Sequence, residues 1–446
     1  MITMTLPLFL LACIRAMMRP GFALALVASM FAIKQLMQSS IPWLATSSVG
    51  SVAINFAVLG VSLVALLLRL VRHENRRADR FNPTWISAVA LYAWSAVTCI
   101  WTPSTTAMEW VGIGLPYFAL LILIAPLLVT SWDDAYRFHQ ALLWIGIPAA
   151  MLILVSPDFT TKYGRLGLEI GGGRTNPLAL GEFGGLLFIA GALWRKPGTV
   201  TLLFRVIALL VGAALAIRSG SRGQFLYAVV IGIAFFPLAA PVRNIRVFLL
   251  TAAGVLVLGF LATQLVELLL DNPLESKRFT IEEMFFGRSS ASGRFANVMV
   301  LFDAWISQPL APILGLGYSA FEYYSGVVGE PYSHVIFADA IFELGLPGAV
   351  LMGIFIVTST RSAIGLFKSS SDDLDRRTSA AMIIAWFAYE TLLANKQGSF
   401  WVMPMMFPAG IVLSQLALHE VHPSSAEETS PEPTSSDESL SPAGQH

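Results

Sequence analysis

The sequence predicts an all-α polytopic membrane protein, and two observations carry this prediction. Of its 446 residues 56% are hydrophobic and 13% are charged, whereas soluble domains carry roughly 25% charged residues. The apolar residues form runs of about 16 to 22, which is enough for a helix to cross a hydrocarbon core about 30 Å thick. The alternation of apolar and polar residues over about ten positions that is typical of a membrane β-barrel strand is not seen.

The apolar runs predict about twelve transmembrane helices. The expected spans are 22–38, 49–70, 85–102, 108–130, 139–155, 177–193, 201–217, 224–240, 245–266, 336–357, 379–394 and 401–418. They divide the chain into spans 1 to 9 (residues 1–266), one large loop (267–335), spans 10 to 12 (336–418) and a tail (419–446). Residues 6–14 are expected to form an interfacial piece, and the start of the chain resembles an uncleaved N-terminus more than a signal peptide.

Lys and Arg residues in the short connections predict the orientation, because cytoplasmic loops are enriched in them. With a cytoplasmic N-terminus, the inside loops are 71–84, 131–138, 194–200, 241–244 and 358–378, and each of them contains Lys or Arg. The short outside loops 39–48 and 103–107 contain none. We therefore expect both termini in the cytoplasm and the large loop outside.

Ten further cations are expected on the outside face, against this trend, and they indicate an anionic ligand there. They are Lys162, Arg165, Arg174, Arg218, Arg222, Lys277, Arg278, Arg288, Arg294 and Lys396. The alternative is that some of them pair with nearby acids. The acids available in the large loop are Asp271, Glu275, Glu282 and Glu283.

The large loop is predicted to contain helices. Residues 280–283 (TIEE) fit a capping box that opens a short helix. Apolar side chains from Phe295 to Ile306 recur at helical spacing, which predicts an amphipathic helix ending near Pro309. Residues 309–331 are rich in Gly and Pro and are expected to form an irregular lid. The tail 419–446 is rich in Ser, Pro and Glu and is expected to be disordered.

Composition also limits the kinds of partner. The net charge is zero, so the gross electrostatics do not favour a nucleic-acid partner. Cys13 and Cys99 offer neither a disulfide framework nor a metal motif. We expect no metal and no cofactor.

Four outside features could converge on one site. They are residues 171–177 (GGGRTNP) with Arg174, residues 218–223 (RSGSRG) with Arg218 and Arg222, residues 292–294 (SGR) with Arg294, and His334. Arginine binds phosphate oxygens with two parallel hydrogen bonds, and glycine lets a backbone approach closely. Three arginines and a histidine could hold a pyrophosphate and deprotonate a nearby hydroxyl.

Each feature also has a plainer interpretation. Glycine-rich turns are often simple connections, and an interfacial histidine is often only a hydrogen-bonded polar residue. Asp339 and Glu343 lie four residues apart on one face of the expected helix. They could support the site, or they could form structural ion pairs, because a buried carboxylate in a span needs a partner.

Together these residues resemble the bacterial O-antigen ligase and O-antigen polymerase superfamily. One signature of this family is similar to the pattern in which His334 is followed, after ten residues, by Gly345-x-x-Gly348. A second signature is similar to Ser221-Arg222-Gly223, which follows a span. Ser292-Gly-Arg294, followed by a helix with Trp305, resembles the segment before the family's histidine. The resemblance covers roughly residues 165–360. Val335 departs from it, since the family usually has Asn, Ser or Gln there.

The resemblance implies a metal-independent, C-type glycosyltransferase of the bacterial inner membrane, with its active site facing the periplasm. The donor would be a glycan on undecaprenyl pyrophosphate, and the acceptor would be a sugar hydroxyl on lipid A-core or on a second lipid-linked glycan. Carried over to this chain, Arg174, Arg222 and Arg294 would hold the pyrophosphate. His334 would be the general base or would orient the acceptor.

The favoured function is that of an O-antigen ligase in lipopolysaccharide biosynthesis. A polymerase of O-antigen or exopolysaccharide would use the same chemistry and is the alternative. A transporter or flippase for a lipid-linked or anionic solute is more distant, because it should place polar groups near the midplane on broken helices. A membrane scaffold would not need the arginines and the histidine to converge.

Overall fold

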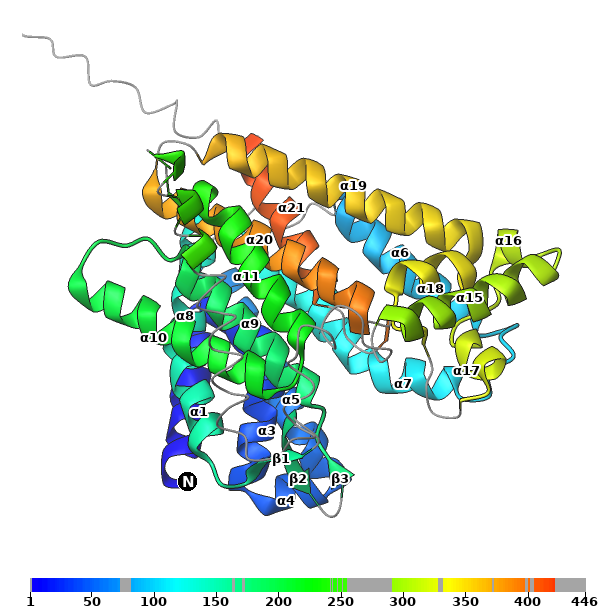
Figure 1. Ribbon diagram of the computed structural model, residues 1–446, viewed down its shortest axis with the longest axis horizontal. Coiled ribbons are helices and arrows are strands. Elements are labelled where there is room, and N and C mark those ends of the chain that lie inside the picture. Colours follow the sequence, from blue (N-terminus) through cyan, green and yellow to red (C-terminus); the bar gives the residue numbers. More distant parts are fainter. Residues whose placement is uncertain are drawn as a thin grey trace, which may run out of the picture.

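The computed structural model describes most of the chain as helix (Figure 1). The described residues are 2–72, 82–162, 165–170, 173–240, 242, 244–246, 248–250, 252–254, 291–327, 332–370, 373–397, 400–401 and 405–421. The predicted capping box at Thr280, the ninth predicted span after residue 254 and the tail after residue 421 lie outside them.

The first half of the chain consists of helices with one small sheet. Its elements are α1 (Ile2–Met18), α2 (Pro20–Ala28), α3 (Met30–Ser40), α4 (Pro42–Thr46), α5 (Ser48–Val71), α6 (Pro83–Thr98), α7 (Ala107–Phe118), η1 (Ala119–Ile124), η2 (Ala125–Leu128), α8 (Trp132–Val155), β1 (Phe159–Lys162), β2 (Arg165–Ile170), β3 (Gly173–Arg174), α9 (Pro177–Leu193), α10 (Thr199–Arg218) and α11 (Arg222–Ala239).

The second half of the described chain is helical. Its elements are α15 (Ala291–Ser307), α16 (Ala311–Leu314), α17 (Ala320–Ser325), α18 (Ile336–Phe342), α19 (Gly345–Ser369), α20 (Leu374–Gln397) and α21 (Met406–Val421). Figure 1 shows α15 to α18 gathered beside the start of α19, at one end of the molecule.

Five of the described helices are long and apolar enough to cross a membrane. They are Val52–Val71, Ala107–Leu128, Trp132–Val155, Thr199–Arg218 and Gly345–Ser369. Four further apolar helices are shorter: Met4–Met18, Pro177–Leu193, Gly223–Ala239 and Met406–Leu418. These helices are consistent with an all-α membrane protein, while the count of twelve spans and the position of the large loop stay predictions.

The first predicted span is bent in the structure. α2 and α3 meet at an angle of 71°, where we expected one straight helix over 22–38. The second part carries buried amides that bind the backbone of other segments: Gln35 donates to the carbonyl of Asn176 at 3.0 Å, and Gln38 donates to that of Leu44 at 3.2 Å. These bonds fix α3 in its new direction, so the pair is either a broken span or a re-entrant loop.

The tenth predicted span is also divided, into α18 and α19. The backbone N–H groups of Leu316 and Gly317 donate to the carbonyls of Phe342 and Glu343 at 2.9 and 2.8 Å, so the incoming 316–317 segment occupies the break. Gly345 has φ of +65°, and a Cβ there would lie 2.3 Å from the nitrogen of Gly315. Glycine is therefore required at this point.

Residues 309–327 are more ordered than the irregular lid we expected, because they contain α16 and α17. A small apolar core fixes them to α15. Its buried members are Leu301, Ala304, Ala311, Leu316, Ala320 and Phe321. The predicted amphipathic helix over 295–306 lies within α15 and ends at Ser307, as expected.

The three-stranded sheet after α8 is a feature that the sequence analysis did not predict. β1 pairs with β2 in antiparallel register, with Phe159 opposite Leu168, and β2 pairs with β3, with Glu169 opposite Arg174. Phe159, Leu166 and Leu168 are buried. The sheet thereby positions the backbone of Arg174 directly before α9.

Helix ends meet at two opposite sides of the bundle. At one side the end of α5 meets the start of α8 through an Arg69–Asp134 ion pair of 3.0 Å, and Arg377 of α20 donates to the carbonyl of Leu238 at the end of α11. At the other side Gln224 of α11 donates to the carbonyl of Leu178 of α9 and to the side chain of Gln397 of α20. We call this second side, where α8, α10 and α20 end and α9 and α11 begin, the site end.

Candidate functional site

His334 lies in a tight turn directly before α18, in a conformation that few residues adopt. Its φ is +71°, a left-handed value that is uncommon outside glycine. The turn is held by Ser333, which donates from its backbone N–H and from its hydroxyl to a carboxylate oxygen of Asp339. The ring of Tyr332 meets the imidazole edge-on, with centroids 4.7 Å apart. The imidazole is half-buried.

Asp339 and Glu343 explain how this region is held. Both side chains are about 1% exposed. Glu343 accepts from the backbone N–H groups of Ser319 and Phe321, at 3.1 and 3.0 Å. Ser319 and His334 are the two residues other than glycine with positive φ in the described part of the chain. Each strained turn is thus bound to one carboxylate, that of Asp339 on α18 or that of Glu343 directly after it.

The contacts of the two carboxyl groups are with hydrogen-bond donors of the neighbouring turns. Among the described residues neither Asp339 nor Glu343 forms an ion pair with an arginine. This favours a positioning role over the structural ion pair considered from the sequence.

α15 brings Arg294 and the His334 turn to one helix. Asn297 donates from its side-chain amide to the carbonyl of Ser333, at 3.5 Å. Arg294 precedes Asn297 by three residues, so both lie on the same helical face. Two of the predicted site residues, Arg294 and His334, therefore lie against one element.

The turn between α10 and α11 lies at the site end and carries Arg218 and Arg222. Arg218 donates to the carbonyl of Leu154 at 3.2 Å, so its charge stabilises the C-terminus of α8. Arg222 is the first residue of α11, and Arg174 is the last residue of β3. The side chains of Arg174 and Arg222 lie outside the described part, so their predicted contact with an anion stays a prediction.

Lys396, in the last turn of α20, reaches this same turn. Its amine donates to the hydroxyl of Ser221 at 2.8 Å. Burial and the positive charges of Arg294 and Arg165 lower the pKa of Lys396 to about 7. The sequence analysis listed Lys396 and Arg165 among the outside cations, but it did not choose them as site residues. The signal in the sequence was their expected position outside, against the positive-inside trend.

A polar network connects the ends of three helices beneath Lys396. Gln397 donates to the carboxylate of Glu182 at 3.3 Å and accepts from Gln224 at 3.0 Å. This network joins α9, α11 and α20 and fixes the position of the last turn of α20. The orientation of Lys396 thus depends on side chains from three helices that are distant in sequence.

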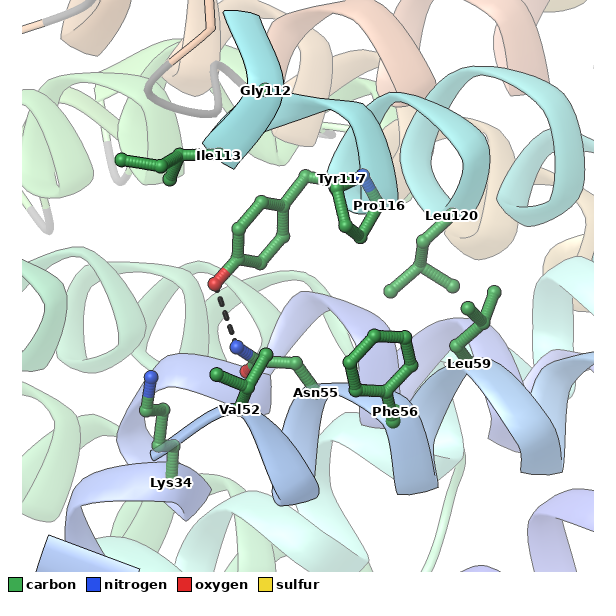
Figure 2. A pocket seen from close by; sticks show the side chains of 10 residues that line it. All are labelled: Lys34, Val52, Asn55, Phe56, Leu59, Gly112, Ile113, Pro116, Tyr117 and Leu120. Atoms are coloured by element: carbon green, nitrogen blue, oxygen red, sulfur yellow. Dashed lines mark hydrogen bonds between the residues drawn. The ribbon is translucent and has the colours of Figure 1, made fainter. Parts of the chain in front are cut away.

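An apolar groove runs between α3, α5 and α7 and encloses about 350 Å³ (Figure 2). Its apolar walls include Phe56, Leu59 and Leu120, and Lys34 lies at the opposite end from the two leucines. Tyr117 reaches across from α7 and accepts a hydrogen bond from the amide of Asn55. The groove therefore offers a long apolar surface with one cation at its end.

The end of the groove at Lys34 adjoins the segment that follows Arg174. Gln35, the next residue, donates to the carbonyl of Asn176 and accepts from the hydroxyl of Thr175, at 3.0 and 2.9 Å. Asn176 in turn accepts from the N–H of Leu178 and caps the start of α9. The groove and the arginine segment are therefore connected through two bonds of one glutamine.

Comparison with known proteins gives one family match, to the family described as O-Antigen ligase, over residues 206–353. No curated protein sequence matches the chain. The matched residues include Arg222, Arg294, His334 and the glycines Gly345 and Gly348, while Arg174 lies before them. The match confirms the resemblance to the O-antigen ligase and polymerase superfamily that these motifs carry.

Proposed function

We propose that the protein transfers a glycan from undecaprenyl pyrophosphate to a sugar hydroxyl at the periplasmic face of the bacterial inner membrane. The observation that carries the proposal is the convergence of Arg294 and the strained His334 turn on α15, with Lys396 close to Arg294. Positive charge beside a candidate base is what a reaction with a pyrophosphate leaving group requires.

In the proposed step, the acceptor hydroxyl oxygen forms a bond to the anomeric carbon of the donor sugar. The bond from that carbon to the pyrophosphate oxygen breaks, and its electron pair leaves with the pyrophosphate. The imidazole of His334 accepts the hydroxyl proton, or it orients the hydroxyl while the leaving pyrophosphate takes up the proton. Arg174, Arg222 and Arg294 stabilise the leaving group, so the step is proposed to need no metal.

The ligase is the favoured form of this proposal, with lipid A-core as the acceptor in lipopolysaccharide biosynthesis. The polymerase of O-antigen or exopolysaccharide is the alternative, and Val335 keeps both open because it matches neither pattern. In this proposal the active site faces the periplasm and both termini lie in the cytoplasm. The distribution of Lys and Arg in the short connections supports this orientation.

The lipid part of the donor is proposed to occupy the groove between α3, α5 and α7. An isoprenoid chain needs an apolar surface, and Phe56, Leu59 and Leu120 supply one. Lys34 at the end of the groove complements a phosphate, and Gln35 connects this end to the segment after Arg174. The isoprenoid chain of the lipid would then lie in the groove, and its pyrophosphate would lie in the adjoining region after Arg174.

Reconstitution into liposomes with a lipid-linked glycan donor tests the proposal. Product on lipid A-core indicates a ligase, and lengthened lipid-linked chains indicate a polymerase. His334→Ala and Arg222→Ala are expected to abolish transfer at normal abundance, and Arg361→Ala, an exposed arginine of α19, is the matched control. Full transfer by His334→Ala would contradict the role of the histidine, and loss of transfer with a chelator would contradict metal independence.

The bend between α2 and α3 keeps a transporter as a second candidate, since transporters use broken helices at their binding sites. The same liposomes separate the two functions. A flippase would move labelled donor across the bilayer without any acceptor, whereas a transferase needs the acceptor for turnover.

A further inference from the structure

The side chain of Lys396 packs against the turn between α10 and α11, which is rich in small residues. Gly223 is the second residue of α11, and a Cβ there would lie 2.7 Å from the amine of Lys396 and 2.8 Å from its Cε. The lysine side chain therefore lies along the first turn of α11, where any larger residue would displace it. Its amine ends at the hydroxyl of Ser221, directly before Arg222.

The elements around Lys396 bring mainly positive charge. α15 contributes Arg294 and the sheet contributes Arg165, both of which act on the amine. α11 contributes Arg222, whose side chain lies outside the described part, and the phenol of Tyr227 near Arg294. The carboxylate nearest in the network is that of Glu182, which Gln397 engages.

Two of these cations, Lys396 and Arg294, are not neutralised by an acid within the described part of the chain. Neither Lys396 nor Arg294 forms an ion pair with a described carboxylate. Like charges close together in a partly buried place are unfavourable unless an anion joins them. The arrangement therefore fits a ligand that carries at least two negative charges.

We propose that Lys396 is a further binding residue for the pyrophosphate of the lipid-linked donor, acting with Arg294 at the start of α11. This inference rests on the proposed function, which supplies the class of ligand. The N-terminus of α11 adds backbone N–H groups beside the amine, and such groups favour phosphate. After glycan transfer the same lysine would hold the lipid pyrophosphate that remains.

A proton should accompany the binding. In the free protein the pKa of Lys396 is about 7, so at pH 8 about nine-tenths of the amine is neutral. A bound pyrophosphate would raise this pKa, because it supplies the negative charge that the site lacks. At pH 8 the lysine should therefore take up about 0.9 protons on binding, and at pH 6 about 0.1.

Titration calorimetry of the full-length protein in detergent with inorganic pyrophosphate tests the inference. Titrations in buffers of different ionisation enthalpy give the number of protons taken up. K396Q is expected to bind about tenfold more weakly than the wild type. K396R is expected to bind well but without the additional proton uptake at pH 8, since arginine stays charged. Subtracting the proton uptake measured for K396R from that of the wild type removes the protons that pyrophosphate itself takes up or releases.

Two further variants keep the result interpretable. Gly223→Ala retains the lysine but displaces its amine, and it should weaken binding by several-fold. K368Q changes an exposed lysine of α19 and should bind as the wild type does. Equal affinities of wild type and K396Q, or no binding by the wild type, would overturn the inference. If pyrophosphate binds through Lys396 but reconstituted protein transfers no glycan, the proposed function fails and the anion site stands.

Discussion

Replacing Asp339 tests whether its carboxylate on α18 positions His334. Asp339→Ala removes the acceptor for both the N–H and the hydroxyl of Ser333, which are buried. A buried donor left without a partner costs about 1–3 kcal/mol. The left-handed conformation of His334 costs about 1–3 kcal/mol more, and it is held in place by this turn.

The size of the effect follows from these two costs. If Asp339→Ala shifts the turn by about 2–3 kcal/mol toward a relaxed conformation, the fraction with His334 in place falls by a factor of about 30 to 150. We expect kcat for glycan transfer to fall by a similar factor while KM for the donor changes little. Asp339→Asn keeps one acceptor oxygen for Ser333 and imitates the protonated acid, so it should retain activity within about fivefold.

The assay is transfer by reconstituted protein, with abundance and thermal unfolding measured for each variant. Wild-type kcat in Asp339→Ala, at wild-type abundance, would refute the positioning role.

Three other substitutions test the fold and the groove. Gly345→Ala places a Cβ 2.3 Å from a backbone nitrogen at φ of +65° and should lower the unfolding temperature by several degrees, whereas Gly353→Ala on the same helix meets nothing within 4 Å and should not. Arg69→Met leaves the buried Asp134 unpaired and should destabilise the protein by about 3–5 kcal/mol, measured by thermal unfolding; unchanged stability would contradict the importance of the ion pair. Phe56→Trp narrows the groove and should raise KM for a donor with a full-length isoprenoid chain but not for a short-chain donor; equal KM changes would contradict lipid binding there.

Much of the helical framework follows from the sequence, because a continuous apolar run is sufficient to predict a span. The expected spans 49–70, 108–130 and 201–217 correspond to helices Val52–Val71, Ala107–Leu128 and Thr199–Arg218. The amphipathic spacing over 295–306 predicted α15 in the same direct way. In each case the information lies within the segment itself, in its hydropathy or its period.

The breaks in helices could not be predicted from hydropathy, because their causes lie elsewhere in the chain. α18 ends where the backbone of residues 316 and 317 binds the carbonyls of Phe342 and Glu343. α3 leaves the direction of α2 after Ala28, and Gln35 within α3 binds Asn176, which is 141 residues away. An apolar run indicates that a segment prefers lipid or the protein core. It does not indicate which distant backbone group will form a hydrogen bond with that segment.

The candidate site shows the same division between local and distant information. His334, Arg222 and Arg294 could be chosen from the sequence because short motifs surround them, and the family match includes all three. Lys396 has no motif of its own, and its place depends on Gly223 and Ser221 on another helix. What marked it in the sequence was a cation on the face that we predict to lie outside, where Lys and Arg are less frequent. In this chain, exceptions to the charge rule therefore suggest candidate residues that motifs miss, and the three-dimensional contacts show which of these candidates lie near one another.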